Sequence, residues 1–570
     1  MAILAKFTGF LGLFVSFFLQ AQVPLSKPDG HIASATIQVD LNKETGEMTP
    51  VWAWFGYDEP NYTYMKDGKK LLSEIAALSP VPVYVRAHSL LVTGDGIPAL
   101  KWGSTNAYTE DANGKPIYNW RIIDSIFDTY VQRGMKPMAQ IGFMPQALST
   151  NPEPYNHDWK PGEPYEKIFT GWRFPPKDYH KWSELVYQWV LHSINRYGKK
   201  EVETWYWELW NEPDSPYWGG TTEEYCKLFD FTADAVKRAL PAARIGGPHV
   251  TGPGGSRGNQ FLGAFLTHCI SGTNYVTGKK GTPLDFIAFH AKGSPRVVEG
   301  HVRMNMGQQL RDINSGFKMV ASFPELRHLP IIIGESDPEG CAACGMKTNP
   351  SNGYRNGTMY SSYTAASFAR KYLLADSFRV NFLGAVTWAF EFENQPWYEG
   401  FRDLATNGVD KPVLNVFRMY GMMKGKRVSV IGNSMYDLKT MVDSSVRRNY
   451  HDIGGLAAKD KNSASVMVWN YHDDDVESPA MPLQILLEGL PAKTVTITHF
   501  RIDAEHSNSN EAWKKMGSPQ SPTAEQIALL EAAGQLKMMG KPEKQKMAGG
   551  KLVLNISMPG QAVSLLKLDW

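Results

Sequence analysis

The sequence predicts an α/β protein, a (β/α)8 TIM barrel with an accessory β-sandwich formed mainly by the C-terminal region. From about residue 50 to 425, short apolar runs alternate with amphipathic helical patterns, which is typical of a parallel sheet. Eight such units over this length favour a closed barrel, whose functional residues lie at the C-terminal ends of its strands. After residue 426, strand-like segments follow one another between turns, as in a β-sandwich.

The first 22 residues are expected to be a secretory signal peptide. Lys6 is the only charge ahead of an apolar run over 7–19, and Ala21 ends a small-residue cleavage site. The run is short for a transmembrane helix, although an uncleaved anchor is the alternative. We therefore expect a secreted or periplasmic protein with no membrane contact after cleavage.

Residues 23–49 carry one alternating strand, around 33–41, which is expected to join the β-sandwich. The barrel is expected over 50–425, with strands at 52–56, 81–87, 136–143, 203–210, 244–248, 285–290, 330–334 and 383–390. Its clearest helical patterns cover 179–197, 223–239 and 360–376. The sandwich region, 426–570, has strand patterns at 465–469, 494–502 and 551–556 and an inserted helix at 523–539.

Composition and cysteine usage limit the possible partners. The chain has 59 basic and 57 acidic side chains, so its balanced charge gives no reason to expect a nucleic acid or an acidic membrane as partner. Four cysteines are present, and Cys341 and Cys344 are close enough in sequence to tie a loop. A zinc site would need a second ligand pair of matching spacing, so a disulfide or free thiols are favoured over a metal.

Two glutamates each end an apolar run that is expected to be a buried strand. Glu212 stands in Trp-Tyr-Trp-Glu-Leu-Trp-Asn-Glu-Pro-Asp (205–214), and Glu335 ends Leu-Pro-Ile-Ile-Ile-Gly-Glu (329–335). Paired carboxylates at barrel strand ends are the catalytic apparatus of glycosidases. The alternative for each is a structural or surface ion pair. Asn211 favours the catalytic interpretation, because an amide beside the acid can bind a sugar 2-hydroxyl.

The two carboxyl groups are expected to differ in role. Glu212 is the predicted general acid/base, with a pKa raised by burial and by the second carboxylate. Glu335 is the predicted nucleophile. A retaining mechanism predicts carboxyl groups about 5–5.5 Å apart.

Further polar residues fall at predicted strand ends: His88, His290, Lys292, Glu391 and, on the following loop, Arg402. A histidine there is as often a structural hydrogen-bonding group as a ligand for substrate. Lys292 either balances the charge of the carboxylates or binds a substrate carboxylate or hydroxyl.

The segment 156–176 is rich in proline and aromatic residues, including Trp172. It is expected to be either a sugar-stacking lid over the barrel mouth or a loop that packs against its neighbour.

These residues belong to a set of motifs that resembles glycoside hydrolase family 39, which contains β-xylosidases and α-L-iduronidases. The resemblance covers nearly the whole mature chain and rests on Asn-Glu-Pro (211–213), Val-Arg-Ala-His (85–88), Ala-Arg-Ile-Gly-Gly-Pro (243–248), Leu-Asp-Phe-Ile-Ala-Phe-His (284–290), Glu-Ser-Asp-Pro (335–338) and the segment 501–508.

The resemblance implies that Glu212 is the acid/base and Glu335 the nucleophile. It also implies that His88, Asn211, His290 and Lys292 line the subsite for the terminal sugar. Lys292 stands where β-xylosidases usually have an aromatic residue and matches the iduronidases, whereas the segment 176–182 and the aromatic loop before it look like the xylosidases. Glu391 stands where the family often has Asp.

The sequence therefore predicts a secreted, retaining, exo-acting glycoside hydrolase with an oligo- or polysaccharide substrate and no metal or organic cofactor. Three substrate classes stay open: β-xylosides, iduronate-type uronides, and arabinose-containing side chains of plant arabinogalactan. An endo-acting enzyme is a further alternative, and a catalytically inactive carbohydrate-binding barrel is the alternative from another functional class.

Overall fold

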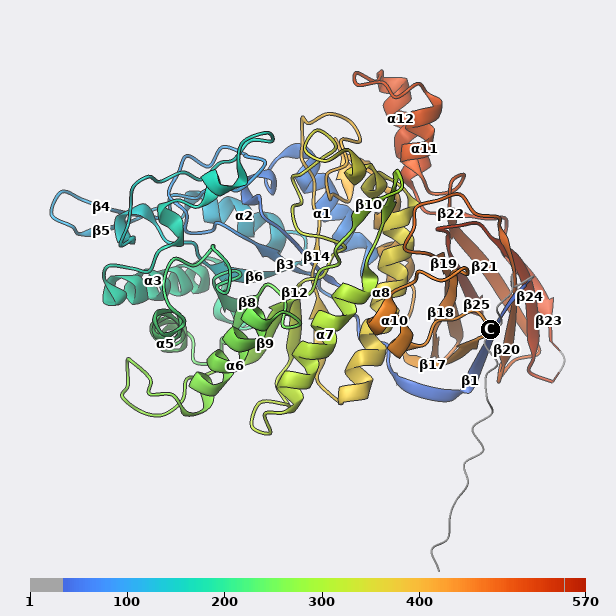
Figure 1. Cartoon of the computed structure of the whole chain (residues 1–570), viewed down its shortest axis with the longest axis horizontal. Helices are drawn as coiled ribbons and strands as arrows, with labels where there is room; N and C mark the ends of the chain where they lie inside the picture. The colour runs from blue at the N-terminus through green and yellow to red at the C-terminus, as the bar shows by residue number, and fades with distance from the viewer. Residues whose placement is uncertain (1–33, 548) are drawn as a thin grey trace, which may run out of the picture.

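The computed structural model describes residues 34–547 and 549–570, so the expected signal peptide lies outside the described residues. Figure 1 shows a barrel surrounded by helices and, beside it, a large twisted β-sheet. In the described part of the chain, no helix combines the length and apolar character needed to cross a membrane.

The barrel strands form one parallel sheet in the order β13-β12-β9-β8-β7-β6-β3-β2-β14. They are β2 (Trp54–Tyr57), β3 (Tyr84–Ala87), β6 (Lys136–Ile141), β7 (Tyr206–Leu209), β8 (Arg244–Val250), β9 (Phe286–His290), β12 (Ile331–Glu335), β13 (Phe382–Ala385) and β14 (Thr387–Trp388). The eighth predicted strand is split in two: β13 pairs with β12, whereas β14 pairs with β2. This division closes the ring, and the predicted barrel is confirmed.

The main helices that follow these strands are α1 (Lys66–Leu78), α2 (Arg121–Val131), α3 (Tyr179–Tyr197), α5 (Thr222–Ala239), α6 (Ser256–Ser271), α7 (Met306–Ala321), α8 (Thr358–Phe378) and α9 (Pro412–Gly421). Two of these helices begin directly after a residue whose side chain caps the helix N-terminus. Asp178 caps α3 by accepting from the backbone of residues 180 and 181, and Thr221 forms a capping box with Glu224 at α5.

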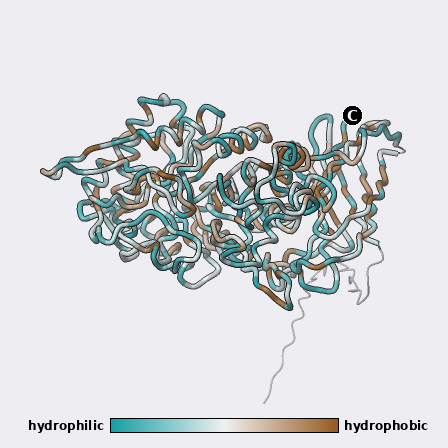
Figure 2. The backbone as a smooth tube through the Cα atoms, turned by 90° about the horizontal axis from the view of Figure 1, so that it is seen from above, coloured by the Kyte–Doolittle hydropathy of each residue, from teal (hydrophilic) through white to brown (hydrophobic). Residues whose placement is uncertain are grey.

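The C-terminal sheet contains β17 (Lys426–Gly432), β18 (Asp452–Asp460), β19 (Ser463–Tyr471), β20 (Met481–Glu488), β21 (Thr494–Ile502), β22 (Lys537–Met538), β23 (Glu543–Lys546), β24 (Leu552–Met558) and β25 (Val563–Asp569). The N-terminal strand β1 (Ala35–Glu47) lies inside this sheet, antiparallel to β17 and parallel to β20. Figure 2 shows short hydrophobic stretches alternating with hydrophilic ones along the chain at this end of the molecule.

Alternation explains the place of β1. Ala35, Ile37, Val39 and Leu41 are buried, while the side chains between them are more accessible. The buried set packs with residues of β19, β20, β21 and β24 in a core separate from that of the barrel. The C-terminal region therefore depends on the N-terminal strand for part of its own core.

The second barrel strand and the inserted helix are among the elements whose bounds differ from the predicted ones. The second barrel strand begins at Tyr84 rather than at residue 81, because Pro80 and Pro82 have no N–H group for a β-ladder. The inserted helix is α12 (Ala524–Gly534), shorter than predicted, and a second helix, α11 (Ser509–Lys515), precedes it. Figure 1 shows both helices projecting above the sheet at the top of the view.

Helix α8 lies between the barrel and the C-terminal sheet and contacts α7, α9, β18 and β19. Arg370 of α8 donates to both carboxylate oxygens of Asp452 on β18, at 2.9 Å each, and both side chains are fully buried. A buried ion pair thus crosses the boundary between the two parts of the molecule.

Candidate active site

Glu212 and Glu335 both lie at the C-terminal edge of the barrel, after β7 and at the end of β12, two strands that β8 and β9 separate in the sheet. Glu335 is the last residue of β12, and Glu212 follows β7 on a turn in which Trp210 and Glu212 both have positive φ. A non-glycine residue with positive φ is uncommon and is often found at functional sites. One carboxylate oxygen from each glutamate and a ring nitrogen of His290 all lie within 4.8 Å of one another.

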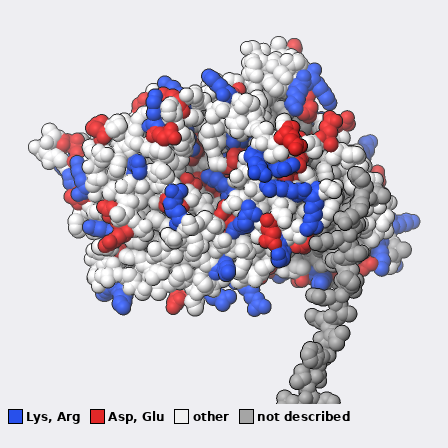
Figure 3. Space-filling view, viewed as in Figure 1, with Lys and Arg blue, Asp and Glu red and all other residues white. Residues whose placement is uncertain are grey.

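The two carboxyl groups face a cavity of about 210 Å³. It is lined by Asp58, Lys101, Trp102, Tyr165, Asn211, Glu212, Tyr217, Thr251, Lys292, Glu335, Gly340, Cys341 and Trp388. A volume of this size suits a single sugar ring better than an extended chain. Outside the cavity, acidic and basic side chains are mixed over the visible face of the molecule (Figure 3).

Lys292 lies between the two glutamates. Its ammonium contacts Glu335 directly and lies 3.7 Å from Glu212 Oε1. Burial alone would lower the pKa of Lys292, but the two carboxylates outweigh it and raise that pKa. Lys292 is therefore charged and paired in the unliganded site.

The pKa predicted for Glu212 is wrong in direction. Burial alone would raise it, but the Lys292 ammonium and the hydrogen bond with His290 Nδ1, at 3.0 Å, hold the pKa of Glu212 below its usual value. The pKa of Glu335 lies well below its usual range, because Lys292, His290, His88 and Arg86 together outweigh the effect of burial. Both carboxyl groups are thus ionised when no substrate is bound.

Arg86 on β3 is fully buried and links three side chains of the site through hydrogen bonds. Its Nε donates to Glu208 Oε1 at 2.6 Å, its Nη1 to Glu335 Oε1 at 3.3 Å and its Nη2 to Asn211 Oδ1 at 3.0 Å. Because the Asn211 oxygen is occupied, the nitrogen of that amide is directed elsewhere. The hydrogen bonds of Arg86 to the site were not predicted, although an arginine inside an apolar strand is a signal for a buried polar contact.

His88 and His290 lie beneath the carboxylates rather than in the cavity lining. His88 Nδ1 is 3.0 Å from Asp58 Oδ1, and its Nε2 is 3.7 Å from Glu335 Oε1. Asp58 also holds Lys101 Nζ at 2.6 Å. Asp58 and Lys101 line the cavity but were not predicted. Asp58 directly follows strand β2, so the strand-end rule could have found it; Lys101 stands on a long loop with no such signal.

Besides His88 and His290, three further residues expected at the subsite do not line the cavity. Glu391 accepts from the Gly408 backbone at 2.7 Å, and Arg402 donates to the Trp388 carbonyl at 2.7 Å and to Glu339 at 2.9 Å. Trp172 donates to the Ile168 carbonyl at 2.6 Å and packs against Phe143. All three side chains are buried and make internal hydrogen bonds, so their expected substrate contacts stay predictions that the cavity lining does not support.

Part of the aromatic segment does reach the cavity. Tyr165 lines it, and the Tyr165 hydroxyl contacts that of Tyr217. Trp159 and Trp172 from the same segment are buried. The segment therefore both packs against its surroundings and contributes one aromatic wall.

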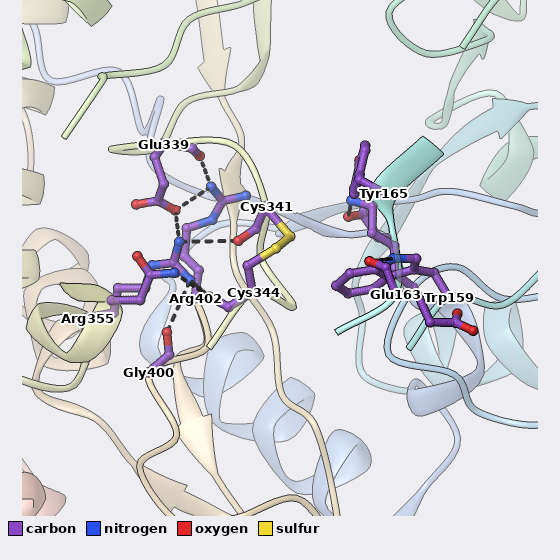
Figure 4. The surroundings of a disulfide bond; sticks show 12 residues. Trp159, Glu163, Tyr165, Glu339, Cys341, Cys344, Arg355, Gly400 and Arg402 are labelled. Atoms are coloured by element: carbon purple, nitrogen blue, oxygen red, sulfur yellow. Dashed lines mark hydrogen bonds and ion pairs between the residues drawn. A yellow bond between two sulfur atoms is a disulfide. The ribbon is translucent and has the colours of Figure 1, made fainter. Parts of the chain in front are cut away.

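Cys341 and Cys344 form a disulfide, and Cys341 lines the cavity. Figure 4 shows this disulfide facing the side of the site that carries Tyr165, with Glu339 and its two arginines behind it. Glu339 Oε1 lies 2.9 Å from both Arg355 and Arg402. The loop after β12 is thus fixed by a covalent bond and by a buried ion cluster.

Two groups of side chains have metal-binding geometry: Asp58 with His88 and Glu335, and Glu212 with His290 and Glu335. Their carboxylates already contact ammonium or guanidinium groups, namely Lys101 for Asp58 and Lys292 for both glutamates. The two ammonium groups already balance the negative charge of these carboxylates, which a metal ion would otherwise do.

The chain is similar to known carbohydrate-active enzymes over most of its length. The family model described as "Glycosyl hydrolases family 39" matches residues 35–549. A β-xylosidase of Geobacillus stearothermophilus is 26% identical over 501 residues, 85% of this chain and 86% of that protein. An α-L-iduronidase of Mus musculus is 24% identical over 606 residues, 97% of this chain and 83% of that protein.

Solved structures show the same fold. A monomeric β-xylosidase from Caulobacter crescentus CB15 superposes with a TM-score of 0.71 at 20% identity, covering 94% of this chain and 99% of that one. The GH39 enzyme from Xanthomonas axonopodis pv. citri gives a TM-score of 0.72 at 21% identity, covering 95% and 98%. Since the family model spans most of the chain, the protein belongs to glycosyl hydrolase family 39 and is a glycoside hydrolase.

Proposed function

We propose that the protein is a retaining, exo-acting glycosidase that removes a terminal pentose from a polysaccharide by double displacement. The proposal rests on the carboxylate oxygens of Glu212 and Glu335, which lie within 4.8 Å of each other beside a cavity of about 210 Å³. Retaining enzymes have carboxyl groups about 5–5.5 Å apart, whereas inverting enzymes leave about 6.5–9.5 Å for a water molecule.

In the first step, Glu335 attacks the anomeric carbon. A carboxylate–carbon bond forms, the bond to the leaving oxygen breaks, and Glu212 gives its proton to that oxygen. In the second step, Glu212 takes a proton from a water molecule that attacks the anomeric carbon and releases Glu335. The low pKa of Glu335 keeps the nucleophile ionised, which this sequence requires.

Asn211 is proposed to bind the sugar 2-hydroxyl. Because Arg86 Nη2 holds the Asn211 oxygen at 3.0 Å, the amide nitrogen is left as a donor for that hydroxyl. A contact at the 2-position strengthens in the oxocarbenium-like transition state. Arg86 acts through Asn211 and Glu335 as a positioning residue.

A neutral terminal sugar fits the charge of the cavity best. The two lysines among its described lining residues already have carboxylate partners, Lys101 with Asp58 and Lys292 with the two glutamates. A terminal xylose or arabinose unit is uncharged, so its binding needs no further cation in the cavity. A terminal uronide is the second candidate, favoured by Lys292, because that ammonium stands at the cavity wall between the catalytic carboxylates.

We also propose that the enzyme is secreted or periplasmic. The support is the sequence pattern of residues 1–22, together with a carbohydrate substrate that a polysaccharide-degrading enzyme meets outside the cytoplasm.

The test is a hydrolysis panel of chromogenic β-xyloside, α-iduronide, α-arabinofuranoside and α-arabinopyranoside. Turnover of a neutral pentoside is expected, and Glu335→Gln should lower its kcat/KM by roughly a thousandfold or more. Glu212→Ala should be rescued by azide, which needs no general-base assistance. Glu325→Gln, an exposed glutamate between α7 and β12, is the matched control and should keep full activity.

Product stereochemistry decides the mechanism. NMR of the first product should show the same anomeric configuration as the substrate, and an inverted product would contradict double displacement. Polysaccharide binding without any product from the panel or from polysaccharide digests would instead support the inactive carbohydrate-binding barrel.

A further inference from the structure

A second and larger cavity, of about 450 Å³, lies between the loop after β12 and helix α11 of the C-terminal region. It is lined by Met346, Gly353, Tyr354, Asn356, Gly357, Thr358, Met359, Tyr398, Asp475, Asn510, Glu511, Trp513, Lys514 and Ser518. None of these residues lines the catalytic cavity. Its lining residues come from barrel loops and from α11, so the cavity lies where the barrel meets the C-terminal region.

One of the lining residues, Asn510, carries an unpartnered polar group. Asn510 is only 2% exposed, and its Oδ1 has no hydrogen-bond partner among the described residues. The neighbouring amide of Asn356 differs, since it donates to the Tyr398 carbonyl at 2.7 Å and accepts from Lys411. A buried acceptor without a partner is costly and uncommon in native proteins. A ligand with hydroxyl groups would supply the missing donor.

Most of the other lining groups suit a neutral, polyhydroxylated ligand, and Asp475, whose pKa is raised by burial, adds one carboxyl group. Trp513 and Tyr398 provide an aromatic pair with ring centroids 4.8 Å apart, and Thr358 adds a hydroxyl. At the rim, Lys514 donates to Glu511 at 2.7 Å, so these two charges neutralise each other. Amide, hydroxyl and aromatic groups around a concave space are the usual composition of a small-molecule site.

The two cavities share one wall. Gly340 and Cys341 line the catalytic cavity, whereas Tyr354 and Asn356, on the 3-10 helix Pro350–Asn356, line the second one. Glu339 joins these parts, because it accepts a hydrogen bond from the Tyr354 hydroxyl and pairs with Arg355. Since one fixed segment contributes residues to both cavities, two units of one polysaccharide can occupy them.

We propose that this second cavity binds a neutral sugar unit on the leaving-group side of the polysaccharide whose terminal residue occupies the catalytic cavity. The inference rests on the proposed glycosidase function for its substrate class. Binding of a sugar unit in the second cavity makes the enzyme prefer long or branched substrates over small glycosides.

The test uses Asn510→Leu and Lys514→Ala in the full-length chain, with Lys515→Ala as the matched control. Lys515 is exposed, neighbours Lys514 and does not line the cavity. In a Glu335→Gln background, which prevents turnover, the dissociation constants for arabinoxylan and arabinogalactan are measured. In the otherwise native background, kcat/KM is measured on the polysaccharide and on a chromogenic pentoside.

Asn510→Leu is expected to weaken binding of one polysaccharide by roughly fivefold or more, the effect of one lost hydrogen bond. Its melting temperature should stay the same or rise, because an unpartnered buried oxygen is removed. Lys514→Ala should weaken binding less, and neither variant should change kcat/KM on the small glycoside. Lys515→Ala should behave as the parent protein.

Unchanged polysaccharide binding in Asn510→Leu would overturn the proposal. A lower melting temperature with parallel losses on both substrates would also overturn it, since the amide would then be structural. If no glycoside were hydrolysed but Asn510→Leu still weakened polysaccharide binding, the second site would stand and the catalytic proposal would fail.

Discussion

Lys292 sets the charge of both glutamates in the unliganded site. Its ammonium contributes to the lowered pKa of Glu212 and of Glu335, although burial opposes both shifts. A nucleophile benefits from this effect, whereas a general acid must be protonated to act in the first step. The proposed chemistry therefore depends on Glu212 gaining a proton as pH falls, and activity should favour the acidic side.

We predict that Lys292→Met shifts the pH profile of kcat/KM to higher pH. Removing the ammonium removes a stabilising charge from both carboxylates, so both pKa values rise. The acidic limb follows Glu335 and the alkaline limb follows Glu212, and both should move upward. The profile is measured on whichever chromogenic glycoside is hydrolysed.

The matched control is Lys280→Met, an exposed lysine on the loop before β9. It should leave the pH profile where it is. A profile of Lys292→Met that is unchanged, or displaced to lower pH, would show that Lys292 does not govern these two groups.

Four of the predicted site residues could be found because functional residues of a barrel lie at the C-terminal ends of its strands. Asn211, Glu212, Lys292 and Glu335 follow directly from strand ends, and all four line the cavity. Their catalytic and binding roles stay predictions. The strand-end rule also selected His88 and His290, which contact the catalytic carboxylates without lining the cavity. It failed for Glu391, because the eighth strand ends at Trp388 and Glu391 accepts a hydrogen bond from the Gly408 backbone.

At the scale of elements, helix α8 is unusual because it is covered on nearly all sides. Most of its residues are buried, including both Arg370 and Lys371. Such a helix has little amphipathic pattern, since no face is reserved for water. Its charged residues therefore needed partners, and Arg370 has one in Asp452. Lys371 contacts Ser367 at 3.5 Å and lies over the Phe368 ring, 3.8 Å from its centroid, but no carboxylate of the described residues pairs with it.

We predict that Lys371→Met stabilises the protein at neutral pH. Burial lowers the pKa of Lys371 from 10.5 to about 7, with Asp337 opposing this shift. Between these values the unfolded chain binds one proton more than the folded chain, so stability rises with pH. The gain from Lys371→Met should be on the order of a few kcal/mol near pH 7 and should shrink as pH approaches that of a free lysine.

Denaturant unfolding at several pH values between 7 and 10 measures this gain. Lys66→Met is the matched control, because that lysine side chain is 90% exposed and should change stability little. A destabilised Lys371→Met at pH 7 would mean that the charged form of Lys371 is favoured by the fold.

At the scale of the whole molecule, the two ends of the chain depend on each other. Strand β1 separates β17 from β20, so without it the C-terminal sheet would lose the strand that joins its two parts. Four apolar side chains of β1 belong to the core of that sheet. The barrel, in contrast, is built from consecutive units.

We predict that a fragment of residues 424–570 does not fold by itself and that a peptide of residues 34–48 restores its folding. The fragment lacks a central strand and would expose two strand edges and part of its core. Circular dichroism and the sharpness of thermal unfolding measure the effect. A peptide with Ile37→Asp and Val39→Asp is the control and should not restore folding; cooperative unfolding of the fragment alone would contradict the prediction.

The barrel could be predicted because its information is local. Each βα unit shows its own periodicity, and a closed ring fixes the neighbours of every strand. The order of the C-terminal sheet could not be read in the same way. Pairing of β1 with β17 and β20 joins residues almost 400 positions or more apart in the sequence. The alternation of apolar and polar residues in a strand shows which of its faces is buried, but it does not show which strands pair with it.

The position of β1 also has a consequence for biosynthesis. β1 is the first strand in the described chain to leave the ribosome, but its two partner strands begin at residues 426 and 481. At ordinary rates of translation, this leaves β1 without its partners for roughly tens of seconds. During that time an alternating strand has unpaired edges that favour aggregation. Factors that hold nascent chains unfolded should therefore raise the yield of this enzyme, and slow synthesis of its last third should lower it.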